Sequence, residues 1–446
     1  MEHRHHRLLA VFAFAILFAL LSAGSVSAAG FALIEQSVSG LGTAFSGGAA
    51  IAEDASTIYY NPAGLTRLSG PQVISGVHVI VPYAQFHNQG SYYMALPGHP
   101  LIAGNDGGDA GGAVPIPNFY FSTRINDRLY AGLGINAPFG LQTNYDSGWV
   151  GRYHALKSDL MTININPSVA YKVTDQLSVG AGVSAQYIKA TLTNAVDFTT
   201  IMTGILHAYS PQPDGFASLT GDSWGYGYNF GLLYEFTPQT RAGLAFRSKV
   251  KQKLTGDVTF AGVPGFITSN TPLFQNCSIS AFLDLPASAS ASFVHQFNSQ
   301  WTVMADITWT QWDSFNELRI KFANPYQPDS VVTTDWRNTF RYSIGAQYAP
   351  VDRLTLKTGI AYDQTPIRSA QYRTPRIPDN SRFWTAVGVN YKVSNSVSVD
   401  AGYAHLFVAD PSTNKADPVE DVTRGALQGY WDANVNIASV QVKVLF

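Results

Sequence analysis

Residues 301–309 read Trp-Thr-Val-Met-Ala-Asp-Ile-Thr-Trp, and their alternating character decides the class of fold. Apolar side chains occupy every odd position, whereas Thr302, Asp306 and Thr308 lie between them. Because the side chains of a β-strand point alternately to opposite faces, this period of two predicts a strand with one apolar and one polar face. The tryptophans at both ends are typical of a strand that spans a membrane, where aromatic side chains collect at the two interfaces.

The same alternation recurs elsewhere in the chain, in segments of about ten residues. It is clear in residues 177–187, in 383–393 and again at the C-terminus, in 440–446. A soluble β-sandwich also contains alternating strands, so the alternation alone leaves two folds open. Aromatic residues near the ends of the segments, such as Tyr342 and Tyr348, favour a transmembrane β-barrel.

The connections between these segments alternate between short and long. Short turns are expected at 126–127, 174–176, 238–239, 298–300, 351–353 and 394–395. Longer polar stretches, rich in Gly and Pro, lie near 87–113, 197–222, 259–279, 323–335, 368–380 and 411–428. Two strands for each short turn, and one more at each chain end, predict an all-β fold. The expected fold is an antiparallel transmembrane barrel of 14 strands over residues 71–446.

The composition supports a barrel and argues against several other classes of protein. Charged residues make up 13% of the chain and aromatic residues also 13%, while the mean hydropathy is +0.01. A helical membrane protein would be far more apolar, and a nucleic-acid-binding protein would be basic, whereas the net charge here is -2. Cys277 is the only cysteine, and no Cys/His cluster has metal-ligand spacing, so neither a metal nor another cofactor is expected.

Residues 1–28 have the three parts of a secretory signal peptide. Arg4 and Arg7 supply positive charge, an apolar run follows, and small residues precede the expected cleavage site after Ala28. The apolar run is shorter than the roughly 20 residues that a membrane-spanning helix needs. An exported barrel of this kind is expected in the outer membrane of a bacterium.

Residues 29–70 do not alternate and are rich in Gly and Ala. Small residues allow short helices and close backbone packing in a confined space. These residues are expected to form a hatch folded inside the barrel, and a soluble periplasmic tail is the alternative. The sequence is thus divided into a signal peptide, 1–28, a hatch, 29–70, and a barrel, 71–446.

Several short motifs follow one another along the mature chain. They are Ala29-Gly30-Phe31, Ser39-Gly40-Leu41-Gly42, Ala44-Phe45-Ser46-Gly47, Asn61-Pro62-Ala63, Pro138-Phe139-Gly140-Leu141, Gly151-Arg152-Tyr153, Ile377-Pro378-Asp379, Arg382-Phe383-Trp384 and Asp400-Ala401-Gly402-Tyr403. Taken in this order, the sequence resembles the FadL/TodX family of outer-membrane hydrocarbon transporters. The resemblance covers nearly the whole mature chain, and no single motif decides it.

The resemblance implies a barrel of 14 strands with an N-terminal hatch in its lumen. It also implies that a hydrophobic substrate lands first in an extracellular groove and then reaches an apolar pocket near the mature N-terminus. In the family, substrates are thought to leave sideways, through a gap in the wall made by a kink in the third strand. The sequence contains no visible nucleotide site or energy-coupling segment, so transport is expected to be passive diffusion.

A fatty acid needs an apolar pocket for its tail and a cation or hydrogen-bond donor for its carboxylate. Phe31 is the candidate for the edge of the pocket. Alternation with the neighbouring aromatic residues places Arg337 and Arg341 on the polar, lumenal face, and Arg337 also corresponds to a basic position in the pocket of the family. The alternative is that both arginines pair with acidic residues of the hatch, such as Glu53 or Asp54.

The expected third strand contains Ala137, Pro138, Phe139 and Gly140. Proline lacks the N–H donor of a β-ladder, so Pro138 must interrupt pairing in a barrel that has no free edge. Through the resemblance this interruption is expected to be the lateral opening, and a bulge or the end of the strand is the alternative.

Asn61, Pro62 and Ala63 could form an ordinary turn, since Asn-Pro favours turn initiation. The family resemblance instead makes these three residues the contact between the hatch and the barrel wall.

The long stretches near 197–222 and 259–279 contain more apolar residues than a solvated loop requires, among them Phe216, Phe266 and Phe274. Exposed apolar clusters mark binding sites. In the family, two such loops form the landing groove, and poorly ordered loop tips are the alternative.

The expected function is the uptake of hydrophobic molecules across the outer membrane, with long-chain fatty acids as the leading cargo. Arg337 favours an acid over the alternative cargo, a neutral aromatic or aliphatic hydrocarbon. An enzyme is not expected, because no Gly-x-Ser-x-Gly motif stands at a plausible nucleophile elbow and the histidines are scattered. The expected partners are the cargo, outer-membrane lipid and lipopolysaccharide, without nucleic acid, and the protein is expected to be a monomer.

Overall fold

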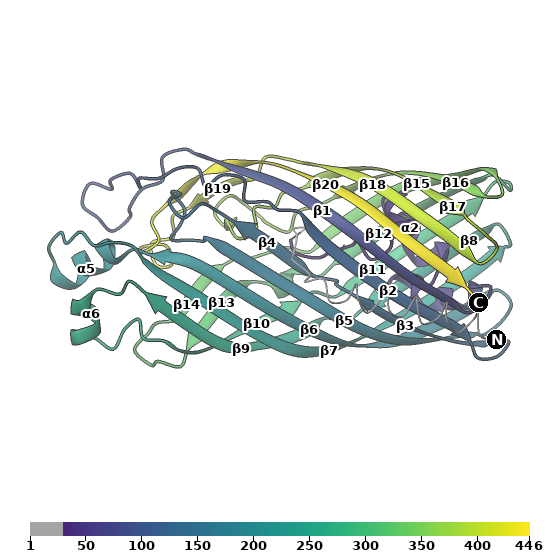
Figure 1. Cartoon of the computed structure of the whole chain (residues 1–446), viewed down its shortest axis with the longest axis horizontal. Coiled ribbons are helices and arrows are strands. Elements are labelled where there is room, and N and C mark those ends of the chain that lie inside the picture. Colours follow the sequence, from purple (N-terminus) through teal and green to yellow (C-terminus); the bar gives the residue numbers. More distant parts are fainter. Residues whose placement is uncertain (1–29) are drawn as a thin grey trace.

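The computed structural model describes residues 30–446, so the expected signal peptide, 1–28, lies outside the described residues. Within that range the chain forms a closed, antiparallel barrel of 14 strands (Figure 1). The barrel closes where β1 (Gln72–Asn88) pairs with β20 (Leu427–Leu445) along all 17 residues of β1. The predicted number of strands and their antiparallel order are therefore confirmed.

Several of the barrel's strands consist of two segments that share one place in the wall. These pairs are β3 (Leu129–Asn136) with β4 (Gly140–Asn144), β8 (Thr240–Arg247) with β9 (Val250–Ala261), β10 (Cys277–Leu285) with β11 (Ser288–Gln296), β12 (Trp301–Thr310) with β13 (Glu317–Phe322), β14 (Ser330–Thr333) with β15 (Thr339–Val351), and β18 (Val397–Val408) with β19 (Ser412–Lys415). The uninterrupted strands are β1, β2 (Val114–Arg124), β5 (Lys157–Lys172), β6 (Leu177–Val196), β7 (Gly215–Thr237), β16 (Leu354–Asp363), β17 (Arg382–Lys392) and β20.

The alternation of β12 follows from its place in the wall. Trp301 and Ile307 are exposed on the outer surface, whereas Met304 is 2% exposed on the inner one. Asp306 also faces inward, where Ser292 and Thr308 donate hydrogen bonds to its carboxylate. A strand with lipid on one side and a polar lumen on the other needs this division of side chains.

Short turns and long loops lie at opposite ends of the barrel (Figure 1). All six predicted short turns join consecutive strands at the end where the C-terminus lies. The long connections include α5 (Phe198–Leu206) and α6 (Gly265–Asn270) at the other end. Three predicted loops are too long. β6 and β7 pair from Val196↔Gly215 onward, so that loop covers 197–214 and not 197–222. β14 lies within the stretch predicted as 323–335, and β19 lies within 411–428.

The segment before β1 folds into α2 (Val38–Leu41), α3 (Gly48–Ile51), α4 (Thr57–Tyr60) and the 3-10 helix η1 (Pro62–Arg67). We call residues 30–68 the N-terminal segment. Most of it is buried against inward-facing residues of the barrel. Arg341 of β15 donates to the carbonyl of Ala44, and Arg241 of β8 donates to that of Ala50. These contacts agree with the predicted hatch. No helix within residues 30–446 is long and apolar enough to cross a membrane.

Candidate functional site

Phe31 lies at the centre of a cage of buried aromatic side chains. Its ring centroid is 4.9 Å from that of Trp312, 5.5 Å from that of Phe315 and 5.9 Å from that of Trp336. The ring of Phe139 lies 6.0 Å away on another side. Three segments far apart in the sequence therefore converge on the third residue of the expected mature chain.

An apolar cavity opens on one side of Phe31, and the space in it and at its open mouth is about 900 Å³. Its walls come from strands on several sides of the barrel. The apolar side chains that line it include Leu141, Leu160, Leu192, Leu219, Leu254, Leu283, Phe315, Leu318, Ile320, Val332 and Ile377. This volume and lining suit the hydrocarbon part of a small amphiphile. The cavity lies beside Phe31, where the sequence predicted a pocket.

Arg376 is the one basic residue that lines the apolar cavity. Its guanidinium donates to the carbonyl of Lys157 at 3.2 Å, to the hydroxyl of Ser158 at 3.1 Å and to the carbonyl of Thr193 at 3.4 Å. Within residues 30–446 no Asp or Glu forms an ion pair with it. Burial and the nearby Arg424 lower the pKa of Arg376 to about 9, as expected for a buried cation without a carboxylate beside it.

The placement of Arg337 corrects the sequence prediction. Its side chain is exposed, donates to the carbonyl of Thr365 and lines no cavity, whereas the neighbouring Trp336 is 0% exposed and packs on Phe31. The strand begins only at Thr339, so the alternation that holds for β15 cannot be extended back to residue 337. Arg341 does follow the alternation and faces inward.

Neither arginine pairs with the acids considered as partners. Arg341 donates to the carbonyl of Ala44, and its guanidinium lies 5.0 Å from the ring of Trp384. The cation that meets Glu53 is Lys357, whose Nζ lies 2.8 Å from Glu53 Oε1 and 3.3 Å from Asp400 Oδ1. Lys357 lies on the inward face of β16. The alternation of this strand in the sequence also places Lys357 on that face, so the sequence contains a signal for this lumenal cation.

The interruption at Pro138 separates β3 from β4. Both segments pair with β5, but only β3 pairs with β2, so no described ladder joins β4 to β2. On the other side of this gap, β2 contains Pro115 and Pro117, which also lack an N–H donor. A Pro-x-Pro motif within a strand indicates an edge that is not fully paired, so the sequence contains a second sign of this gap.

The N-terminal segment covers the kink and satisfies its backbone. Gly140 N–H donates to the carbonyl of Phe31 at 2.9 Å, and Leu33 N–H donates to that of Pro138 at 2.8 Å. Gln36 Nε2 donates to the carbonyl of Ala137 at 2.8 Å. Residues 137–140 are all buried, so the gap in strand pairing is filled here by the N-terminal segment.

Asn61, Pro62 and Ala63 contact the inner wall where two strands carry glycine. Asn61 Nδ2 donates to the carbonyl of Leu232 at 3.0 Å. A Cβ atom on Gly231 would lie 1.8 Å from Asn61 Oδ1, and one on Gly180 would lie 2.3 Å from the nitrogen of Ala63. Only glycine allows so close an approach, so the wall is shaped to receive these residues.

The three loop phenylalanines have different surroundings. Phe274 packs at 5.1 Å on Phe198 of α5 and at 5.4 Å on Phe260 of β9. Phe266 of α6 is exposed, and Phe216 is exposed on the outer face of β7. The loops bearing α5 and α6 thus share one apolar cluster, which includes Phe274 and lacks Phe216.

The family described as "Outer membrane protein transport protein (OMPP1/FadL/TodX)" matches residues 19–446. The chain belongs to this family. It is therefore an outer-membrane transport protein and not an enzyme, and the resemblance seen in its motifs is confirmed. Within residues 30–446 no group of His, Cys, Asp and Glu side chains could hold a metal ion.

Several relatives of this OMPP1/FadL/TodX family member match it over most of their length. It is 33% identical over 419 residues to outer membrane protein P1 of Haemophilus influenzae, covering 87% of this chain and 88% of that protein. It is 31% identical over 417 residues to the long-chain fatty acid transport protein of Escherichia coli O6:H1, covering 88% and 90%.

Solved structures show the same architecture. A FadL homologue of Pseudomonas aeruginosa superimposes with a TM-score of 0.86 at 28% identity, over 94% of this chain and 100% of that one. The toluene transporter TodX of Pseudomonas putida gives a TM-score of 0.69 at 18% identity, over 95% and 100%, a likeness that concerns the fold alone.

Proposed function

We propose that this outer-membrane transporter takes up long-chain fatty acids by passive diffusion. The observation that carries the proposal is the apolar cavity beside Phe31, with the single buried cation Arg376 in its wall. The cavity suits an alkyl chain, at about 0.8 kcal/mol for each buried CH₂. The guanidinium of Arg376 has no carboxylate partner and would meet the head group of an acid. The name of the Escherichia coli relative supports the same cargo.

In this proposal residues 29–70 act as a hatch and 71–446 as the barrel. Cargo lands on the apolar cluster of the loops around Phe266 and Phe274 and then enters the cavity. It leaves sideways between β2 and β4 once residues 31–36 withdraw from the kink. The lipid and lipopolysaccharide around the barrel are its other partners, and the transporter works as a monomer.

A binding comparison between oleate and its methyl ester tests the cargo. The two ligands share a tail, so only the acid gains from Arg376. Arg376→Gln should weaken oleate binding roughly tenfold or more and leave the ester unchanged, since a charge-assisted hydrogen bond is lost. Arg368→Gln, in the same loop but exposed, is the control. Equal affinity of the wild type for acid and ester would favour neutral hydrocarbons as cargo.

A further inference from the structure

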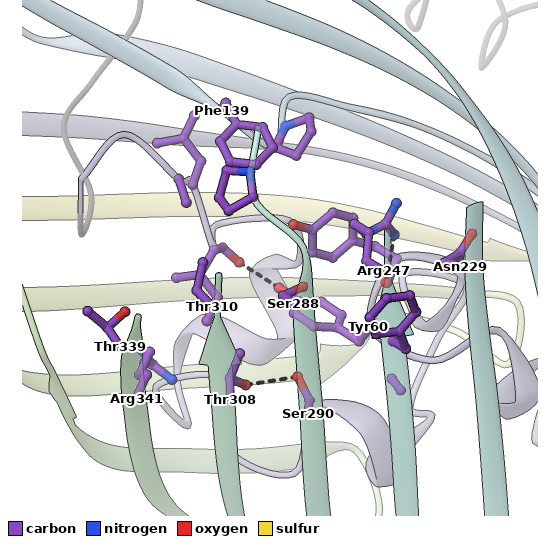
Figure 2. A pocket seen from close by; sticks show the side chains of 18 of the residues that line it. Tyr60, Phe139, Asn229, Arg247, Ser288, Ser290, Thr308, Thr310, Thr339 and Arg341 are labelled. Atoms are coloured by element: carbon purple, nitrogen blue, oxygen red, sulfur yellow. Dashed lines mark hydrogen bonds between the residues drawn. The ribbon is translucent and has the colours of Figure 1, made fainter. Parts of the chain in front are cut away.

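A second cavity is shown in Figure 2, and the space in it and at its open mouth is about 1010 Å³. It is lined by Trp312, whose ring contacts that of Phe31. Phe31 in turn lines the first cavity. Pro138 and Phe139 of the kink line it as well. The two cavities are therefore neighbours separated by the Phe31–Trp312 contact, and the second one reaches the kink.

The second cavity has a mixed lining, and one of its walls is polar, unlike the lining of the first. A row of hydroxyl groups runs across three neighbouring strands: Ser288 and Ser290 on β11, Thr308 and Thr310 on β12, and Thr339 on β15. The hydroxyls of Ser290 and Thr308 lie 2.9 Å apart. Thr308 donates to Asp306, and Ser290 therefore donates to Thr308, whereas Ser288, Thr310 and Thr339 can donate to an anion and so solvate a carboxylate in place of water.

Two arginines lie on either side of the hydroxyl row (Figure 2). Arg341 is opposite Thr308, and Arg247 is opposite Ser288. Arg341 is 5% exposed, and its Nε and Nη1 have no hydrogen-bond partner. A buried guanidinium with two unused N–H groups is costly unless something fills its donors.

The two acids around the cavity both lie near Arg341 and not near Arg247. Asp363 lines it opposite Arg341, and Asp306 lies below the hydroxyl row, held by Ser292 and Thr308. Arg247 faces no acid: it donates to the carbonyl of Tyr59 at 2.9 Å and lies over the ring of that residue. Of the two cations that line the cavity, one therefore lacks a counter-charge.

We propose that this polar cavity is a second binding station, which holds the carboxylate head group of a fatty acid between Arg247 and the hydroxyl row. The inference rests on the proposed function, because it needs an acidic cargo. In the first station the head group meets Arg376, and in the second it has crossed the Phe31–Trp312 contact. The tail then lies against Pro138 and Phe139, next to the gap between β2 and β4.

The two stations can be counted with oleate labelled with ¹³C at the carboxyl carbon, added to the mature protein in lipid nanodiscs. Two protein-dependent carboxyl resonances are expected. Arg247→Gln should remove one and leave the other, and Arg376→Gln should remove the complementary one. Arg353→Gln, an exposed arginine in a short turn, should leave both. Heat-modifiable migration on gels checks that each variant is folded.

Arg247 also contacts the N-terminal segment, so the loss of a resonance in Arg247→Gln could come from a disturbed fold. A second variant, which keeps Arg247, separates the two explanations. Ser290→Leu fills the cavity without removing a charge and should abolish the same resonance as Arg247→Gln. A single resonance that is lost only with Arg376→Gln would overturn the second station and leave the proposed cargo intact. The absence of any protein-dependent resonance would overturn the fatty acid cargo itself.

Discussion

Glu35 is a buried carboxyl group in the stretch that covers the kink. It is 1% exposed, and its Oε2 accepts no hydrogen bond. Burial raises the pKa of Glu35 to about 7, although Arg382 and Arg341 oppose the shift. Its protonation therefore changes near neutral pH, at a position between Leu33 and Gln36, which both bind the kink.

Residues 31–36 should be held more tightly in acid than in base. The pKa in the folded protein lies above the ordinary value of 4.5, so the stabilisation is complete below 4.5 and is lost as the pH rises through 7. The difference corresponds to roughly 3 kcal/mol. Hydrogen exchange of these amides, corrected for intrinsic rates, should accelerate between about pH 4.5 and pH 7.5 and change little above that. Glu35→Gln should remove the change, and an unaltered pH response in that variant would refute the assignment.

At the scale of elements, the barrel wall is complete only with the N-terminal segment in place. Ala32 and Phe139 form an isolated antiparallel bridge between the segment and the kink. Thr162 of β5 supports the same place, donating to the carbonyl of Phe139 and accepting from its N–H. The kink is thus a gap that a separate piece of chain fills, which allows it to open without breaking a strand.

Locking this bridge should stop transport. Ala32 and Phe139 face each other as a non-hydrogen-bonded antiparallel pair. The Cα atoms of such a pair lie about 4.5 Å apart, a separation that a disulfide can span. In a Cys277→Ser background, Ala32→Cys with Phe139→Cys should block oleate uptake when oxidised. Reduction of the same protein should restore it, which serves as the internal control. Uptake that is equal in both redox states would exclude the lateral route.

The contact between the N-terminal segment and the wall should depend on Gly231. A methyl group there would collide with Asn61 Oδ1, so Gly231→Ala should push Asn61 off the wall. The barrel should remain folded while ion conductance across lipid bilayers rises. Gly204→Ala in α5, where a Cβ meets nothing within 4 Å, is the control. Unchanged conductance would show that the contact does not hold the segment.

At the scale of the whole molecule, the barrel and its contents are held by different forces. The wall closes through the β1–β20 ladder, which involves no residue of the N-terminal segment. The segment is held by apolar packing, such as that of Leu41 and Phe45 on the inner wall, and by buried polar contacts, such as those of Lys357 with Glu53 and with the carbonyl of Ser39. Closure removes the sheet edges everywhere except at the gap between β2 and β4, so most of the wall satisfies its backbone without the N-terminal segment.

Deleting residues 30–68 from the mature protein should therefore leave a folded barrel with an open lumen. Single-channel conductance should increase by about an order of magnitude, because a barrel of this width then holds water in place of packed protein. Heat-modifiable gel migration and conductance in planar bilayers measure the two properties separately. A variant that never folds would show that the segment is part of the folding core.

The sequence predicted most of the wall because strand alternation is a local property. In a regular strand, the face on which a side chain lies follows from the faces of its neighbours, and the inward position of Arg341 was predicted correctly for that reason. The six short turns, which separate the alternating segments, were also predicted correctly. The rule ends where a strand is interrupted, as it is before Thr339. Arg337 was misplaced for that reason, and Trp336 took the inward position beside Phe31.

The sequence by itself determined the class of fold, the strand order and the family, since these depend on periodicity, turns and ordered motifs. Only the tertiary structure decided which residues meet. Arg376 belongs to a loop without periodicity, and it reaches the apolar cavity because closure brings that loop against β5 and β6. Contacts between residues hundreds of positions apart follow from the circular arrangement of the strands, which no local pattern encodes.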